Sequence, residues 1–240
     1  MPAYPADPTA AAFIARLEGE ATDEERRKYR RYFPERHDAF IGVRMGAVFA
    51  AARDFVGMDL DQIERLLEHD AHEVRAGAVR IMAEQAKARA TTDAHLQALA
   101  ALYLCRHDRI DDWDLVDLGA WEVLGRSLLD RPRNVLDELA ASDDPWRRRS
   151  AITATFAFIR RGELDDTYRV AELLISDEHE LVRKAVGWAL RNAGDHDLGR
   201  LAAFLDGHAA SMPRSTLRNA IEKFPPEERK RLLARGRPTA

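Results

Sequence analysis

Apolar residues recur at helical spacing along almost the whole chain. Near the N-terminus, Asp7 and Pro8 form one helix-start pattern, and Thr22 with Glu25 forms a capping box that opens a second, highly charged helix. From Ile41 onward the apolar positions follow the period of an α-helix. Breaks are predicted at Gly57, Asp70, 90–92, Asp111, 131–132, 143–145, Gly162, 176–177, Gly194 and 225–226. No segment alternates as a strand would, so the pattern predicts an all-α protein.

A five-residue segment occurs six times along the chain. Its copies are V-R-M-G-A (43–47), V-R-A-G-A (74–78), V-D-L-G-A (116–120), R-R-R-S-A (147–151), V-R-K-A-V (182–186) and L-R-N-A-I (217–221). Their second positions are 31, 42, 31, 35 and 35 residues apart, close to the period of helix-pair repeats. We therefore predict a solenoid of helix pairs in which each segment opens the second helix. The expected organisation is one repeat domain over 1–240, with N-terminal helices at 7–33, repeats at about 38–224 and a C-terminal tail at 225–240.

Asp117 interrupts a row of arginines. The second position is arginine in the other five copies, at Arg44, Arg75, Arg148, Arg183 and Arg218. Trp113 precedes Asp117 by four residues, which places both side chains on one helix face. A brace or helix cap is the alternative role for Asp117, and bracing of the neighbouring repeat is the alternative for the arginines, above all Arg44 and Arg75.

Composition restricts the class of protein. The chain has 240 residues, 46% of them hydrophobic, 32% charged, and one cysteine, so no internal disulfide framework is possible. We see no signal peptide and no apolar run of bilayer length, and we expect a cytoplasmic monomer, associated with the nucleoid if the source is bacterial. The net charge of −4 argues weakly against a polyanionic partner, but the segment 143–161 carries five arginines against two aspartates.

Several kinds of chemistry lack a motif. The eight histidines form no metal pattern, and neither a Gly-rich phosphate loop nor a nucleophile elbow is present. We therefore expect no metal and no cofactor. Tryptophans do lie near cations: Trp188 shares a helix face with Lys184 and Arg191, and Trp146 precedes three arginines. Such faces suit stacking on bases, packing on sugars or holding a cationic ligand.

Three longer motifs carry a resemblance to a known family. The segments W-D-L-V-D (113–117), W-R-R-R-S-A-I (146–152) and K-A-V-G-W-A-L-R (184–191), with 29–44 before them, resemble the AlkD type of DNA alkylation repair glycosylase, which is built from HEAT-like repeats. The resemblance implies a metal-independent, monofunctional enzyme that releases N3- or N7-alkylated purines from double-stranded DNA. It implies catalytic-site roles for Trp113, Asp117, Arg149 and Trp188. Trp121 departs from the family, in which proline often follows the alanine.

The row of cations predicts where DNA would be held. The expected DNA-binding residues are Arg44, Arg75, Arg148, Arg183, Lys184, Arg191, Arg214 and Arg218. Two other functions remain open: a non-catalytic binder of unusual DNA structures, and a HEAT-like protein-interaction module. The combination of Trp113, Asp117, Arg149 and Trp188 favours the enzyme, because a carboxylate on a surface that faces phosphates would only weaken a simple binder.

Overall fold

The computed structural model describes residues 8–32 and 39–235, and it confirms the all-α prediction. The only β-type pairing in these residues is one isolated bridge between Ala39 and Ala71. The α-helices are α1 (Ala10–Glu18), α2 (Asp23–Tyr32), α3 (Met45–Asp54), α4 (Leu60–Leu67), α5 (His72–Lys87), α6 (Asp93–Cys105), α7 (Trp113–Gly119), α8 (Val135–Ala140), α9 (Pro145–Ala154), α10 (Phe156–Ile159), α11 (Asp165–Leu174), α12 (Glu180–Gly194), α13 (Leu198–His208), α14 (Arg214–Ala220) and α15 (Pro226–Arg235). A 3₁₀ turn (His107–Arg109) precedes α7, and a π-helix (Ala120–Gly125) follows it.

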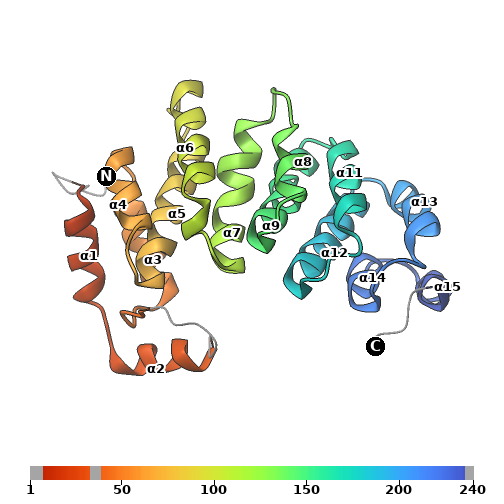
Figure 1. The fold of residues 1–240 in the computed structure, drawn as a ribbon, viewed down its shortest axis with the longest axis horizontal. Helices are drawn as coiled ribbons and strands as arrows, with labels where there is room; N and C mark the ends of the chain where they lie inside the picture. Colours follow the sequence, from red (N-terminus) through yellow and green to blue (C-terminus); the bar gives the residue numbers. More distant parts are fainter. Residues whose placement is uncertain (1–7, 33–38, 236–240) are drawn as a thin grey trace. The chain divides into compact units, whose positions relative to one another are not determined.

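The helices form two compact units, residues 1–127 and 128–240 (Figure 1). In the first unit α3, α5 and α7 pack side by side, and α4 and α6 pack on α5. In the second unit α9, α12 and α14 pack side by side, with α8, α11 and α13 against α9 and α12. Each unit is therefore a stack of helix pairs, as the repeated segment predicts. The single repeat domain over 1–240 stays a prediction.

Helix boundaries differ from the sequence prediction at two places near the C-terminus. The predicted helical stretch after Gly194 is divided at 209–213 into α13 and α14, where Ser211 donates to the carbonyl of His208 and Pro213 precedes α14. The predicted tail at 225–240 contains α15, which buries Leu232. Pro226 occupies the first position of α15, where proline is well tolerated.

Three of the five arginines of the repeated segment share one structural task. Arg75, Arg148 and Arg183 each donate to the two carbonyls that lie five and six residues earlier, in the loop that leads into their own helix. The acceptors are Asp70 and His69 for Arg75 (2.9 and 3.2 Å), Asp143 and Ser142 for Arg148 (both 2.9 Å), and Glu178 and Asp177 for Arg183 (2.5 and 2.8 Å). These bonds satisfy loop carbonyls that would otherwise need water.

Two of these arginines also connect successive repeats. Arg75, only 2% exposed, reaches Asp111 of the next interhelical loop at 3.2 Å, and Arg148 reaches Asp177 at 2.6 Å. The geometry therefore favours the bracing interpretation for Arg75 and Arg148. A carboxylate cannot donate to carbonyls, so the side chain of Asp117 cannot make this brace. Instead, Asp112 caps α7 by accepting from the amide of Trp113 at 2.7 Å.

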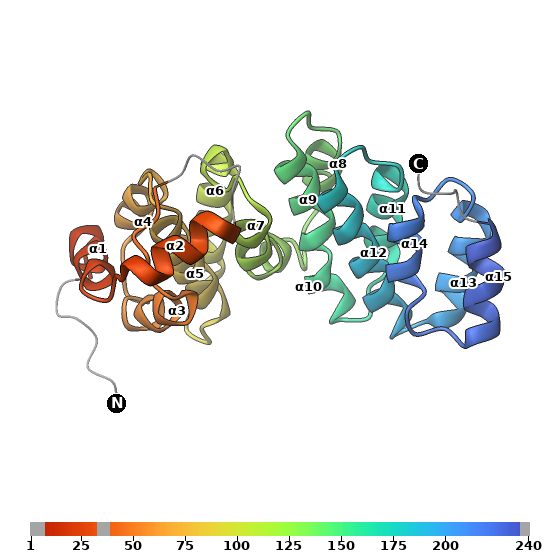
Figure 2. The same cartoon turned by 90° about the horizontal axis from the view of Figure 1, so that it is seen from below.

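A buried carboxylate positions α2. Glu73 of α5 accepts hydrogen bonds from the amides of Ile41, Gly42 and Val43 at 3.2, 2.7 and 3.4 Å. The carbonyls of the same segment face α2: Arg26 donates to Ile41 at 2.9 Å, and Tyr29 Oη donates to Val43 at 2.8 Å. Gly42 has φ +94°, and a Cβ at this position would collide with Thr22. Residues 41–43 thus join α2, which runs crosswise to α3 (Figures 1 and 2), to the stacked helices.

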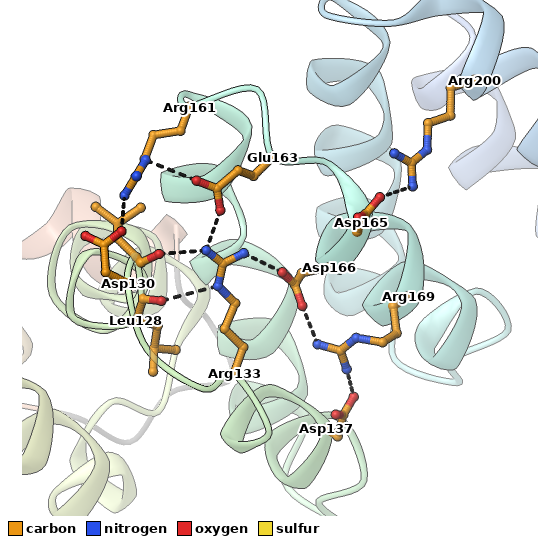
Figure 3. A network of polar contacts seen from close by, with 11 residues as sticks. Leu128, Asp130, Arg133, Asp137, Arg161, Glu163, Asp165, Asp166, Arg169 and Arg200 are labelled. Atoms are coloured by element: carbon orange, nitrogen blue, oxygen red, sulfur yellow. Dashed lines mark hydrogen bonds and ion pairs between the residues drawn. The ribbon is translucent and has the colours of Figure 1, made fainter.

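An ion-pair network joins α8 and α11 in the second unit (Figure 3). Arg133 donates to the carbonyl of Leu129 at 2.8 Å, pairs with Asp166 at 2.5 Å and with Glu163, and lies 3.8 Å from the ring centroid of Phe158. Arg169 extends the network by pairing with Asp166 and Asp137. Charged side chains on the outer helices of this unit are therefore largely occupied in joining neighbouring repeats.

Arg75→Met tests the bracing role. The variant removes the donors for two loop carbonyls and an ion pair while keeping an apolar stem of similar length. We expect a loss of about 3 kcal/mol in the free energy of unfolding, because buried acceptors left unsatisfied are costly. Arg44→Met is the control: that side chain is 74% exposed and pairs with Glu25, so it should cause a much smaller loss. Equal losses in chemical denaturation would rule out the brace.

Tyr29→Phe tests the docking of α2 through its dependence on pH. Burial, together with the carboxylates of Glu73, Glu25 and Asp114, raises the pKa of Tyr29. The folded state therefore favours the neutral phenol, and this contribution is complete below the unfolded pKa of about 10 and is lost as pH rises above it. We expect the stability difference between wild type and Tyr29→Phe to shrink from pH 8 to pH 11. Tyr32→Phe, on a ring that is 68% exposed, is the matched control for loss of a hydroxyl from α2.

Candidate functional site

A cavity of about 650 Å³ lies in the first unit, between α2, α3 and α7. Its walls are mostly apolar and aromatic, and its charged groups come from α2, α7 and the residue that precedes α3. The lining residues are Glu25, Lys28, Tyr29, Tyr32, Arg44, Met45, Phe49, Trp113, Asp114, Asp117 and Leu118. The structure therefore brings Trp113 and Asp117 to one cavity, as their spacing predicts.

The short helix α7 forms one wall of the cavity. Gly119 allows α7 to approach its neighbours closely: a Cβ here would lie 2.6 Å from the ring of Tyr103 and 2.7 Å from Val79. The π-helix at 120–125 begins directly after α7, and such widened turns are frequent at functional sites. Close packing on one side and the cavity on the other fix the direction in which Asp117 and Trp113 point.

The acids at the start of α7 have different partners. Asp112 is the N-cap of α7, and Asp111 pairs with Arg75. Asp114 has a partner on another helix, because its Oδ2 lies 2.7 Å from Nε2 of the fully buried His72. This pair joins the first turn of α7 to the first turn of α5. The sequence gives no signal for it beyond the two residue types, since 42 positions separate them.

Cations at the rim of the cavity are paired within the chain. Lys28 lies 2.8 Å from both Glu24 and Glu25, and Arg44 lies 3.0 Å from Glu25. The hydrogen bond from Lys28 is the main cause that lowers the pKa of Glu25. The rim thus combines cations with carboxylates, whereas the interior is aromatic. Sequence reasoning missed Lys28, Tyr29, Tyr32 and Phe49, and the resemblance of 29–44 to the family was the only signal for this region.

The other two predicted catalytic residues lie in the second unit. Arg149 is 5% exposed and donates to the carbonyl of Leu181. Trp188 is half-buried on α12 and packs against Phe156, with ring centroids 4.3 Å apart. The catalytic-site roles of Arg149 and Trp188 stay predictions, and the hydrogen bond to Leu181 gives Arg149 a packing role within the second unit.

The remaining predicted DNA-binding residues differ in exposure. Lys184 and Arg218 are exposed, and Lys184 pairs with Glu180 on its own helix at 2.7 Å. Arg191 pairs with Glu222, and Arg214 donates to the carbonyl of Leu233 at 2.9 Å. Among the predicted DNA-binding cations of the second unit, Lys184, Arg214 and Arg218 therefore remain the best placed for an outside anion. The others, Arg148, Arg183 and Arg191, are engaged in contacts within the chain.

The part of the chain that the structure describes has neither a metal-binding cluster nor a membrane-spanning helix. No group of three or more His, Cys, Asp or Glu side chains is arranged to hold a metal ion in residues 8–32 and 39–235. None of the described helices combines the length and apolar character needed to cross a membrane.

Comparisons with known proteins agree with the resemblance seen in the sequence. No curated protein sequence matches the chain. Among solved structures, a predicted DNA alkylation repair enzyme from Enterococcus faecalis has the same fold, with a TM-score of 0.68 at 14% identity over 86% of this chain and 98% of that one. A family model described as DNA alkylation repair enzyme matches residues 13–224. Because this match spans most of the chain, including the cavity and both helix stacks, the chain belongs to the DNA alkylation repair enzyme family.

Proposed function

We propose that the protein is a DNA glycosylase that hydrolyses the N-glycosidic bond of N3- or N7-alkylated purines in double-stranded DNA. The observation that carries the proposal is the position of Asp117: a carboxylate and a tryptophan face one cavity whose walls are otherwise largely aromatic. Family membership supports the repair role, and the cavity supports the chemistry.

The substrate itself supplies part of the reactivity. Alkylation at N3 or N7 makes the purine cationic, so the base departs as a neutral leaving group when it takes the electron pair of the glycosidic bond. Positive charge then develops on the sugar. The carboxylate of Asp117 stabilises this charge and orients a water molecule, whose oxygen bonds to C1′ while its proton is lost to the carboxylate or to solvent. Aromatic walls lower the local dielectric constant and so strengthen the attraction between Asp117 and a cation.

The aromatic residues supply the binding surface. The electron-rich face of Trp113 attracts a cationic base and packs on the sugar. Tyr29 and Phe49 on the other walls offer further ring faces. In the proposal Trp188 packs against the sugar and backbone from the second unit, and Arg149 contributes to phosphate binding. No metal or cofactor takes part.

The exposed cations hold the duplex. Arg44, Lys184, Arg214 and Arg218 are the best-supported contacts with phosphates, because their side chains reach solvent or line a surface pocket. Phosphate contacts fix the register of a protein on DNA without reading sequence. Such binding suits an enzyme that must find a damaged base in any sequence. A single protein chain is sufficient for this mechanism.

A non-catalytic DNA binder is the second candidate, and the acidic cavity argues against it. Asp114, Asp117 and Glu25 all line the space next to Trp113. Carboxylates at a DNA-binding surface repel phosphates, so they reduce affinity unless they serve a cationic ligand. The protein-interaction alternative would gain support if the protein failed to bind duplex DNA at low salt.

Asp117→Asn separates the enzyme from both alternatives. The amide keeps the shape of the side chain and removes its charge, so we expect release of 7-methylguanine from duplex DNA to slow by about 10²–10³-fold in single-turnover assays. Duplex affinity should hold steady or increase, because a negative charge is removed. The melting temperature should stay near that of wild type.

Asp54→Asn is the control, since Asp54 is an exposed carboxylate at the end of α3. It removes the same charge outside the cavity and should leave base release unchanged. If Asp117→Asn instead melted at a lower temperature and its folded fraction excised at the wild-type rate, Asp117 would be a helix brace, and the proposed catalytic role would be wrong.

A further inference from the structure

A second pocket lies between the last two helices and is lined by cations. Its volume is about 470 Å³, and its lining residues are Arg214, Pro226, Arg229, Lys230, Leu233 and Ala234. Half of these residues are basic and none is acidic. Arg214 begins α14 and the others belong to α15, so the pocket exists only because residues 226–235 fold as a helix against α14.

The acidic residues near this pocket are occupied by other cations. Arg231 pairs with Glu228 and, at 2.7 Å, with Asp206 of α13, and Arg235 also reaches Asp206 at 2.8 Å. These contacts anchor α15 on α13. Hydrogen bonds from Arg231 are the main cause that lowers the pKa values of Asp206 and Glu228, so both remain ionised partners of Arg231 at neutral pH.

Arg229 and Lys230 have the opposite character. Both are exposed, and no ion pair to either is found among the described residues. Arg214 donates one Nη1 hydrogen bond to the carbonyl of Leu233, which fixes its guanidinium on the pocket wall. Arg218 lies one turn further along α14 and is exposed. Fixed and unpaired cations around a concave surface form a site for a multiply oxygenated anion.

The distribution of charge between the two units points to the same kind of ligand. Residues 1–127 contain six more acidic than basic residues, whereas residues 128–240 contain two more basic than acidic residues. The excess of positive charge in the second unit includes α14 and α15. Because a polyanion is attracted to the unit with surplus cations, this surface suits a nucleic-acid backbone.

We propose that the pocket between α14 and α15 binds a backbone phosphate of the DNA duplex and extends the DNA-binding surface to the C-terminal helix. The occupant is the duplex of the proposed function, so the inference rests on that function for the identity of its ligand. Arg229 and Lys230 supply the contacts, and Arg214 positions the phosphate from the opposite wall. The site adds affinity without base specificity and takes no part in breaking the glycosidic bond.

The salt dependence of duplex binding tests this site. Each phosphate contact contributes about −0.9 to the slope of log K against log salt concentration. Because the pocket holds one phosphate, Arg229→Gln combined with Lys230→Gln should make the slope shallower by about 0.9 and weaken binding to damaged and undamaged duplexes by the same factor. Fluorescence anisotropy on a labelled duplex at several salt concentrations gives both quantities.

Arg53→Gln combined with Arg89→Gln is the matched control. Both arginines are exposed, lie in the first unit and have no ion pair among the described residues, so the change in net charge is the same. The control should keep the wild-type slope. An unchanged slope for the α15 variant, or an equal change in the control, overturns the inference, as does an α15 variant that loses affinity for an acidic peptide but not for DNA.

Single-turnover release of 7-methylguanine at saturating protein distinguishes this inference from the proposed function. The α15 variant should keep the wild-type rate once the duplex is saturated. If the wild-type protein releases the base but the α15 variant keeps the wild-type slope, only the phosphate site is overturned. If the α15 variant shows the expected loss of slope but the wild-type protein releases no base, only the glycosylase proposal is overturned. Absence of duplex binding at low salt overturns both.

Discussion

The cavity depends on one buried carboxylate. Glu73 accepts three amide hydrogen bonds from residues 41–43, and the carbonyls of those residues hold Arg26 and Tyr29 of α2. None of the residues of α2 itself is fully buried, and the ring of Tyr29 supplies an apolar contact by stacking on Phe40 with centroids 5.3 Å apart, so polar contacts carry much of the attachment of this helix. A carboxylate that accepts several backbone amides is strongly stabilised, and removing it would leave the amides unsatisfied. Without this contact the cavity would lose the wall formed by Glu25, Lys28, Tyr29 and Tyr32.

The repeated arginine explains which position of a helix pair becomes available when Asp117 replaces it. In three repeats the arginine satisfies the loop before its own helix, and in two of them it also reaches the following repeat. The same position of α7 faces the cavity through Asp117. The loop before α7 is secured by other residues instead: Asp112 caps the helix, and Asp114 bonds to His72. The repeat that contains α7 could thus carry Asp117 in place of the structural arginine, because Asp112 and Asp114 secure the loop before the helix.

The sequence predicted the helix-pair architecture because apolar periodicity and the repeated segment are local signals. It also predicted the common face of Trp113 and Asp117, since that follows from a spacing of four. The break at 209–213 was missed because apolar residues continue through it, from Leu205 and Ala209 to Met212 and Leu217. The wall formed by α2 was missed for a different reason: it depends on a contact between Glu73 and a segment about 30 residues earlier. Glu73 read in isolation is only the last acid of an acidic stretch, and nothing local marks it as buried.

The acidity of the first unit is consistent with a DNA repair enzyme if one part of the protein attracts the duplex and another part selects the damaged base. In the proposed function, the surplus cations of the second unit attract the duplex, and affinity there depends on phosphates that every sequence shares. The cavity has the opposite preference, because its carboxylates repel phosphates and attract cations. A neutral purine gains nothing from Asp117, whereas an alkylated purine brings a positive charge that the carboxylate and the ring of Trp113 both attract. In the proposed function, an acidic cavity thus lowers the affinity for DNA in general but favours the damaged base over undamaged ones. An enzyme that searches among undamaged bases requires this preference.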